Sequence, residues 1–259
     1  MSFLNNTIAV GMLASLGAGL LTGVGAIPIF FTNKVSEKML DILLGFAAGV
    51  MLAATSFSLI IPSLEHGGGG LKGALITAAG IFIGALFLDL TDKFSPHEHL
   101  LDKRVEGGVA SDSLKKIWLF IIAITIHNFP EGLAVGVGFG NNNISNGLSI
   151  ALGIGLQNMP EGMAVAVALV REKYSAKYAF AIALLTGLVE PIGGVLGLLL
   201  VSVFKPILPF TLAFAAGAML FVISDEIIPE THQRGYERQA TFGVIIGFII
   251  MMILDVTLG

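Results

Sequence analysis

Long apolar runs alternate with short polar turns along almost the whole of this chain of 259 residues. A run of about 20 apolar residues is long enough to cross a lipid bilayer as an α-helix. Only 12% of the residues are charged, whereas about a quarter are charged in soluble domains. The sequence therefore predicts an all-α polytopic membrane protein, and its eight expected helices cover residues 5–31, 39–64, 71–91, 116–140, 144–170, 177–204, 207–230 and 239–258.

The expected helices form a single transmembrane domain over residues 1–259, and the longest polar segment between them is the loop at residues 92–115. Twelve of the 14 Lys and Arg residues fall in this loop and the other odd-numbered connections, while only Lys72 and Lys205 fall on the opposite side. Loops retained in the cytoplasm are enriched in basic residues. We therefore expect the 92–115 loop in the cytoplasm and both termini outside, in a plasma membrane of the bacterial inner-membrane type.

Two related hexapeptides interrupt the fourth and fifth apolar runs. HNFPEG covers residues 127–132 and QNMPEG covers residues 157–162. On a helix, His127 and Glu131 lie one turn apart on one face, as do Gln157 and Glu161. An ionisable group in the middle of a membrane costs several kcal/mol unless it is paired or hydrated, so each cluster indicates a functional site.

A third carboxylate, Glu190, lies at a similar depth in the sixth apolar run, and Pro130, Pro160 and Pro191 each fall in mid-span. Carboxylates this close together must be protonated or neutralised by cations. The chain has no Cys, so a metal ion would be held by imidazole, carboxylate, amide or thioether groups. The candidate metal ligands are His127, Asn128, Glu131, Gln157, Asn158, Glu161 and Glu190. Met51 also reaches the midplane, where it is either a thioether ligand or a packed core residue.

The chain also repeats itself outside the hexapeptides. FAAGVML begins at Phe46 and FAAGAML at Phe214, while LLTG begins at Leu20 and again at Leu184. The third and eighth helices share a GxxxG pattern, at Gly80 with Gly84 and at Gly243 with Gly247. Helices one to three therefore match helices six to eight, and five spans before the second set make it inverted. Helices four and five are expected to form a central antiparallel pair.

Further polar residues near the inner ends of the helices suggest an exit route for an ion. They are Asp89, His97, His99, Asp225 and Glu226. Each also has an ordinary interpretation as an interfacial or solvated side chain. A rival class is an intramembrane metallohydrolase, but the histidines other than His127 fall near helix ends or in loops, where they could not complete a catalytic zinc site. A passive metal channel remains an alternative.

The hexapeptides, their places in the fourth and fifth of eight helices, and the basic loop before them resemble the ZIP (Zrt/Irt-like) family of metal transporters, over essentially the whole chain. The resemblance implies a 3+2+3 helix bundle and a two-metal centre at the seven candidate ligands, bridged by Glu131 and Glu161. It also implies a thioether contact from Met51. Relatives of this type commonly carry His where this chain has Gln157, and many carry an acid where it has Asn158.

What the family implies for function is inward transport of a divalent transition metal by an elevator-like movement of helices one, four, five and six. Zinc is the substrate we expect, with cadmium, iron and manganese as alternatives, and two ions could occupy the centre together. No enzymatic activity, catalytic cofactor or nucleic-acid partner is expected. The partners are then metal ions and the lipid bilayer, and a homodimer is one arrangement that the sequence leaves open.

Overall fold

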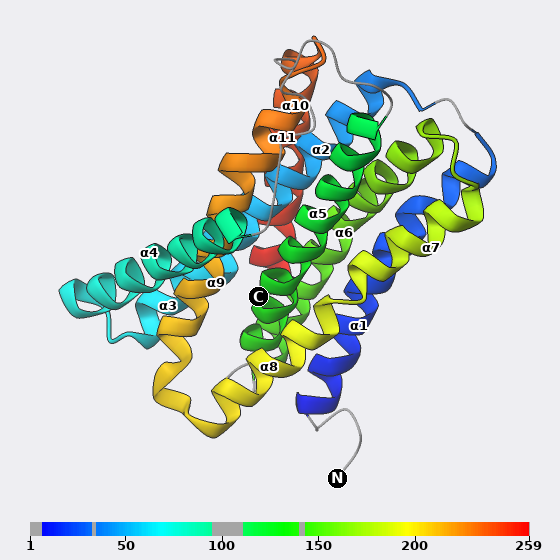
Figure 1. The fold of residues 1–259 in the computed structure, drawn as a ribbon. Helices are drawn as coiled ribbons and strands as arrows, with labels where there is room; N and C mark the ends of the chain where they lie inside the picture. Colours follow the sequence, from blue (N-terminus) through cyan, green and yellow to red (C-terminus); the bar gives the residue numbers. More distant parts are fainter. Residues whose placement is uncertain (1–6, 33–34, 95–110, 140–142, 259) are drawn as a thin grey trace.

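The computed structural model describes residues 7–32, 35–94, 111–139 and 143–258, and these residues form helices joined by short turns, with no β-strand among them (Figure 1). The predicted all-α class is confirmed. Most of the polar loop expected at residues 92–115, including His97 and His99, lies outside the described residues.

The first half of the chain forms three long helical segments. The second of them contains a π-helical stretch just before Pro62, whose missing amide hydrogen disturbs the regular α-helical hydrogen bonds. The elements are α1 (Thr7–Ala26), the short 3-10 helix η2 (Ile27–Phe30), α2 (Glu37–Ala53), the π-helix η3 (Ala54–Ile60), α3 (Ile61–His66) and α4 (Gly70–Phe94).

The second half begins with two helices of 28 residues each, α5 (Ser111–Gly138) and α6 (Ile144–Arg171). The helix predicted at residues 177–204 is divided into two, and the one predicted at 207–230 again contains a π-helical stretch. The remaining elements are α7 (Ala176–Gly187), α8 (Glu190–Val203), the short 3-10 helix η5 (Lys205–Ile207), α9 (Leu208–Val222), the π-helix η6 (Ile223–Ile227), α10 (Ile228–Thr231) and α11 (Glu237–Leu258).

Within the described part of the chain, six helical segments are long and apolar enough to cross a membrane. Large apolar side chains cover the outer faces of these segments; Phe82 on α4, for example, is 69% exposed. Such a surface suits contact with lipid rather than water. The segments are Thr7–Phe30, Glu37–His66, Gly70–Thr91, Ala176–Val203, Lys205–Thr231 and Glu237–Leu258. The helices α5 and α6, each of which carries one polar hexapeptide, are not in this set.

Two helix pairs on the outside of the bundle pack through their small residues in the same way. A Cβ atom added at Gly84 of α4 would collide with the carbonyl oxygen of Phe214 on α9. Likewise, a Cβ atom at Gly247 of α11 would collide with the carbonyl oxygen of Phe46 on α2. Each GxxxG pattern therefore lies against an FAAG sequence, which is the close backbone approach that small residues permit in membranes.

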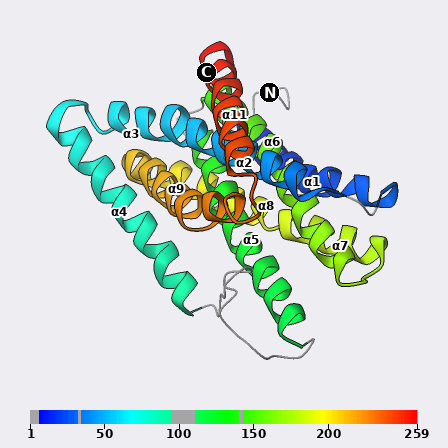
Figure 2. The ribbon, with the colours of Figure 1, turned by 90° about the horizontal axis from the view of Figure 1, so that it is seen from above.

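The helices α5 and α6 lie side by side in the middle of the bundle (Figures 1 and 2). The helices α2 and α9 pack on one side of them, and α1 and α7 pack on the other. The two hexapeptides are therefore enclosed by helices from both ends of the sequence.

Candidate metal-binding site

The residues predicted as metal ligands on α5, α6 and α8 are all buried, and none is more than 5% exposed. The helices α5 and α6 continue without interruption through Pro130 and Pro160, so residues one turn apart in each hexapeptide share a face as expected. The buried set is His127, Asn128, Glu131, Gln157, Asn158, Glu161 and Glu190.

Glu190 reaches the site from a broken helix. The helices α7 and α8 are separated by residues 188–189, and Pro191, which cannot donate a backbone hydrogen bond, follows directly after the break. Glu190 is therefore in the first turn of α8, where the helix dipole stabilises a negative charge. The hydroxyl of Ser15 on α1 donates to the backbone carbonyl of Glu190 at 3.0 Å, which fixes the break against α1.

Amide side chains join the carboxylates across helices. The Gln157 side-chain amide on α6 donates a short hydrogen bond to Oε1 of Glu131 on α5. The Asn158 amide, also on α6, donates to Oε1 of Glu190 at 2.5 Å and to the carbonyl oxygen of Ala18 on α1 at 2.9 Å. Four helices thus contribute to one connected polar cluster.

The cluster is rich in negative charge. Glu131 lies within electrostatic range of Glu161 and Glu190, and Glu161 lies within range of both His127 and Glu226. Several buried oxygen atoms have no hydrogen-bond partner among the described residues: Oε2 of Glu131, Oε1 of Gln157, Oδ1 of Asn128 and Asn158, Oε1 of Glu161 and Oε2 of Glu190. Unpartnered buried oxygens are costly, and a cation is the partner that suits them.

The present side-chain arrangement does not itself form a closed coordination shell. Among the described residues, no three His, Asp or Glu side chains converge closely enough to hold a metal ion. Gln157 and Asn158 each donate to one oxygen of a carboxylate in this arrangement.

Glu226 belongs to this cluster, although the sequence suggested it only as part of an exit route. Its Oε1 lies 2.5 Å from Nε2 of His127. Glu226 is in the π-helix η6, which changes the direction of side chains relative to a regular helix. An Ile-Ile-Pro sequence follows each of the two FAAG sequences and ends at Pro62 and at Pro229, and its distance from the FAAG sequence differs by one residue between the two. This offset is the sequence signal that could have placed Glu226.

Three further expected residues lie within the described part of the chain. Met51 is fully buried in an apolar cluster that also contains Ala18 and Ile154, and its role as a thioether ligand stays a prediction. Asp225 is exposed and Asp89 is half-buried on α4. Glu226, from the predicted exit route, contacts the predicted metal ligand His127.

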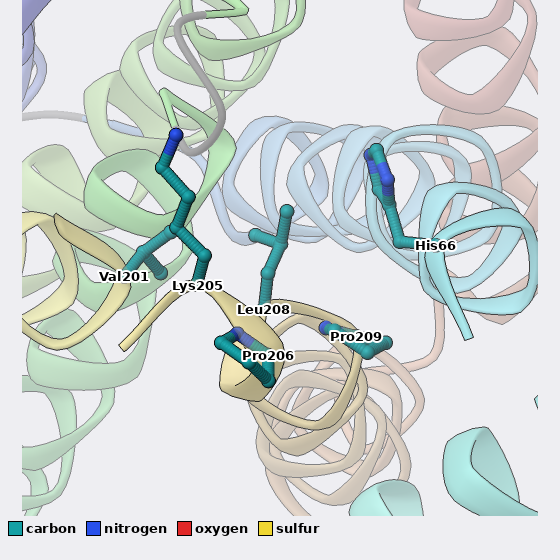
Figure 3. Close-up of a pocket in the computed structure, with 6 residues that line it drawn as sticks. All are labelled: His66, Val201, Lys205, Pro206, Leu208 and Pro209. Atoms are coloured by element: carbon teal, nitrogen blue, oxygen red, sulfur yellow. The ribbon is translucent and has the colours of Figure 1, made fainter. Parts of the chain in front are cut away.

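A separate pocket lies where α3, α8 and α9 meet (Figure 3). None of the predicted metal ligands lines it. The lining residues are His66, Val201, Lys205, Pro206, Leu208 and Pro209. The polar cluster between α5 and α6, and not this pocket, is therefore the candidate site.

Comparison with known proteins assigns the chain to a family. The family model described as ZIP zinc transporter matches residues 96–255. Zinc transporter GufA of Myxococcus xanthus is 46% identical over 256 residues, which cover 97% of this chain and all of that protein. Zinc transporter ZIPB of Bordetella bronchiseptica is 40% identical, with 98% and 84% of the two chains covered, and human zinc transporter ZIP11 is 35% identical, with 92% and 94% covered. The chain belongs to the ZIP family, and membership of this transporter family confirms the expectation that it is not an enzyme.

Proposed function

We propose that the protein carries divalent metal ions, with zinc as the main substrate, across the membrane through the cluster between α5 and α6. The observation that carries this proposal is that Glu131, Glu161 and Glu190, from three different helices, are buried together and each keeps an oxygen atom without a partner. Family membership supports the same function, because the relatives compared are named zinc transporters. Cadmium, iron and manganese suit the same carboxylate and imidazole donors.

Two ions in the centre are supported by the charge balance. Glu131, Glu161, Glu190 and Glu226 carry four negative charges when ionised, and two divalent cations would neutralise them. Glu131 and Glu161 occupy the fifth position of their hexapeptides on neighbouring helices, so both can bridge the two ions. Gln157 and Asn158 are neutral, and they contribute oxygen atoms without adding charge.

The architecture that we infer has eight spans in a 3+2+3 arrangement, with α5 and α6 as the central pair. Each of these helices has 28 residues, which corresponds to about 42 Å and exceeds the roughly 30 Å of the hydrocarbon layer. The matching contacts of Gly84 with Phe214 and of Gly247 with Phe46 support an inverted repeat on either side of this pair. The distribution of basic residues favours termini outside. Inward transport is the direction that we infer from the resemblance to ZIP transporters.

An elevator-like movement is supported by where the backbones touch. One group consists of α1, α5, α6, α7 and α8, and the other consists of α2, α3, α4, α9, α10 and α11 with the two π-helices. Wherever a Cβ atom added to a described glycine would collide with backbone, as at Gly132 with Glu190 or Gly49 with Val244, both residues lie in the same group. Between the groups, the glycine contact at Gly153 is with the side chain of Met251. Side-chain contacts allow small sliding movements more readily than interlocked backbones do.

The function is tested by zinc uptake into proteoliposomes that contain a zinc-sensitive dye. We expect a protein-dependent signal that saturates with external zinc, because a carrier has a limited number of sites. Liposomes without protein and liposomes with the Glu161→Ala variant are the controls. The absence of a signal with zinc, cadmium, iron and manganese would refute the proposal, and an initial rate that rises linearly with zinc at all concentrations would identify a passive channel instead.

A further inference from the structure

The helices α1 and α7 cross at two glycines that contact each other reciprocally. A Cβ atom added at Gly19 would collide with the carbonyl oxygen of Gly187, and one added at Gly187 would collide with the carbonyl oxygen of Gly19. A reciprocal contact of this kind is the mark of a local two-fold axis. The two residues are 168 positions apart, which is also the separation of Phe46 and Phe214 in the FAAG sequences.

The same separation relates the contacts that these helices make with the two hexapeptides. A Cβ atom at Gly25 of α1 would collide with the carbonyl oxygen of Met159, the third residue of its hexapeptide. At Gly193 of α8, 168 positions later, it would collide with the carbonyl oxygen of Phe129, which is again the third residue. The local two-fold axis therefore exchanges α1 with the α7 and α8 pair, and α6 with α5.

The equivalent of Glu190 in this arrangement is Thr22. A Cβ atom at Gly132 would collide with the carbonyl oxygen of Glu190, and a Cβ atom at Gly162 would collide with the carbonyl oxygen of Thr22. This register differs from the one suggested by the two LLTG sequences, which would pair Thr22 with Thr186. The correction is one helical turn, and it follows because backbone contacts, and not residue identity, determine how the helices cross.

Thr22 has the properties of a site residue. It is fully buried, and its hydroxyl has no hydrogen-bond partner among the described residues. The hydroxyl of Thr186, by contrast, donates to the carbonyl of Ala183 in its own helix at 2.8 Å. The two-fold relation that exchanges Thr22 with Glu190 also exchanges Asn128 with Asn158. Glu190 and Asn158 are hydrogen-bonded to each other, whereas both polar atoms of the Asn128 amide lack a partner within the described residues.

We propose that the Thr22 hydroxyl and the Asn128 side-chain oxygen form a neutral donor pair that contacts the transported divalent cation, as the counterpart of the charged Glu190 and Asn158 pair. This inference rests on the proposed transport function and adds a residue on α1 to its site. Hydroxyl and amide oxygens are ligands for divalent cations but do not add charge. The ion is thus held by a carboxylate on one side of the axis and by neutral oxygens on the other. Because the neutral side adds no charge, the affinity of the site for the ion is limited, which favours release.

The test compares Thr22→Val, which keeps the shape and removes the hydroxyl, with Thr22→Ser, which keeps the hydroxyl. Thr186→Val is the matched control, because it removes a buried hydroxyl from the same helix crossing. We expect Thr22→Val to raise the KM for zinc uptake and the Kd for zinc by roughly fivefold to tenfold, the size expected for one lost polar contact. Thr22→Ser should stay close to the parent, and Thr186→Val should leave both constants unchanged.

Two outcomes would overturn the inference. One is a Thr22→Val protein that melts at the parent temperature without zinc and keeps the parent KM and Kd. The other is an equal loss in Thr22→Val and Thr22→Ser, which would point to packing of the methyl group. If Thr22→Val lowers the melting temperature, a double-mutant cycle with Asn128→Ala decides between a ligand role and a packing role. The effects of the two substitutions on the Kd for zinc are non-additive if both residues contact one ion, and they are additive if the residues act independently. A parent protein without zinc uptake would refute the proposed function itself, which is a separate result.

Discussion

Nε2 of His127 on α5 lies 2.5 Å from Oε1 of Glu226 in the π-helix η6, and this contact links the two groups of helices that we propose to move against each other. A metal ion that binds to His127 competes with this contact or incorporates Glu226 into its own shell. Binding of the ion and movement of α5 relative to η6 are then coupled through one pair of side chains.

The first prediction follows from this pair. Glu226→Ala removes one partner of His127 and one of the four carboxylate charges, so the KM for zinc should rise. The maximal rate should also fall several-fold, because the moving helices lose a contact that must re-form. Asp225→Ala is the matched control, since Asp225 is the exposed neighbour of Glu226. Concentration-dependent uptake in proteoliposomes separates the two constants. A higher KM with an unchanged maximal rate would show that Glu226 acts only as a ligand.

The second prediction ranks the hexapeptide residues. Glu131→Ala and Glu161→Ala should each abolish zinc uptake, because each change removes a charge that both proposed ions share. Asn158→Ala removes a neutral group and should keep part of the uptake. The three variants must be compared at matched expression and with melting temperatures measured without zinc. A folded Glu131→Ala protein that binds and transports zinc like the parent would contradict the bridged centre.

The position of the site could be predicted from sequence because its chemistry is local. HNFPEG and QNMPEG hold polar residues at helical spacing within apolar runs, and the structure brings both hexapeptides together with Glu190. Pro191 also marks the place where α7 and α8 separate. The approximate extents of most helices followed from the lengths of the apolar runs, since a bilayer requires about 20 residues, whereas the break between α7 and α8 did not.

The contact of Glu226 with His127 and the proposed role of Thr22 did not follow from helical periodicity, because both depend on helix register. A π-helix inserts one extra residue in a turn, so the direction of Glu226 cannot be read from 3.6-residue periodicity. Thr22 is hidden by the LLTG match, which is a similarity of apolar residues and not of contacts. The burial of Met51 among apolar residues likewise became visible only once its neighbours were in place.

The third prediction concerns orientation. Lys72 and Lys177 are exposed in the first turns of α4 and α7, at helix ends that the basic-residue count assigns to opposite sides of the membrane. The parent chain has no Cys, so Lys72→Cys and Lys177→Cys each introduce a single thiol. An impermeant maleimide should label Lys72→Cys on intact cells and Lys177→Cys only after permeabilisation. The reverse pattern would mean that the termini face the cytoplasm.

The fourth prediction concerns a buried ion cluster near one end of the bundle. Nη1 of Arg234 donates to Oδ1 of Asp41 on α2 at 2.5 Å, and Nη2 donates to Oε1 of Glu230 on α10. The side chain of Asp41 is fully buried, and its Oδ2 atom has no partner within the described residues. Arg234 therefore compensates the charge of Asp41 and ties α2 to the turn before α11.

Burial lowers the pKa of Arg234, but the nearby Glu230 and Asp41 carboxylates outweigh burial and raise it above its ordinary value. A raised folded-state pKa contributes stability at every pH below the unfolded-state pKa, and this contribution is lost only as the pH rises through the folded-state pKa. Arg234 therefore stays charged at every pH in which the protein is handled. Arg234→Gln should destabilise the fold by about 3 kcal/mol, because Asp41 is then buried without its cation. The double variant Arg234→Met with Asp41→Leu should recover most of this loss, since it removes both charges. Melting temperatures in detergent measure both the loss in Arg234→Gln and its recovery in the double variant. A melting temperature of Arg234→Gln equal to that of the parent would show that solvent already compensates the charge of Asp41.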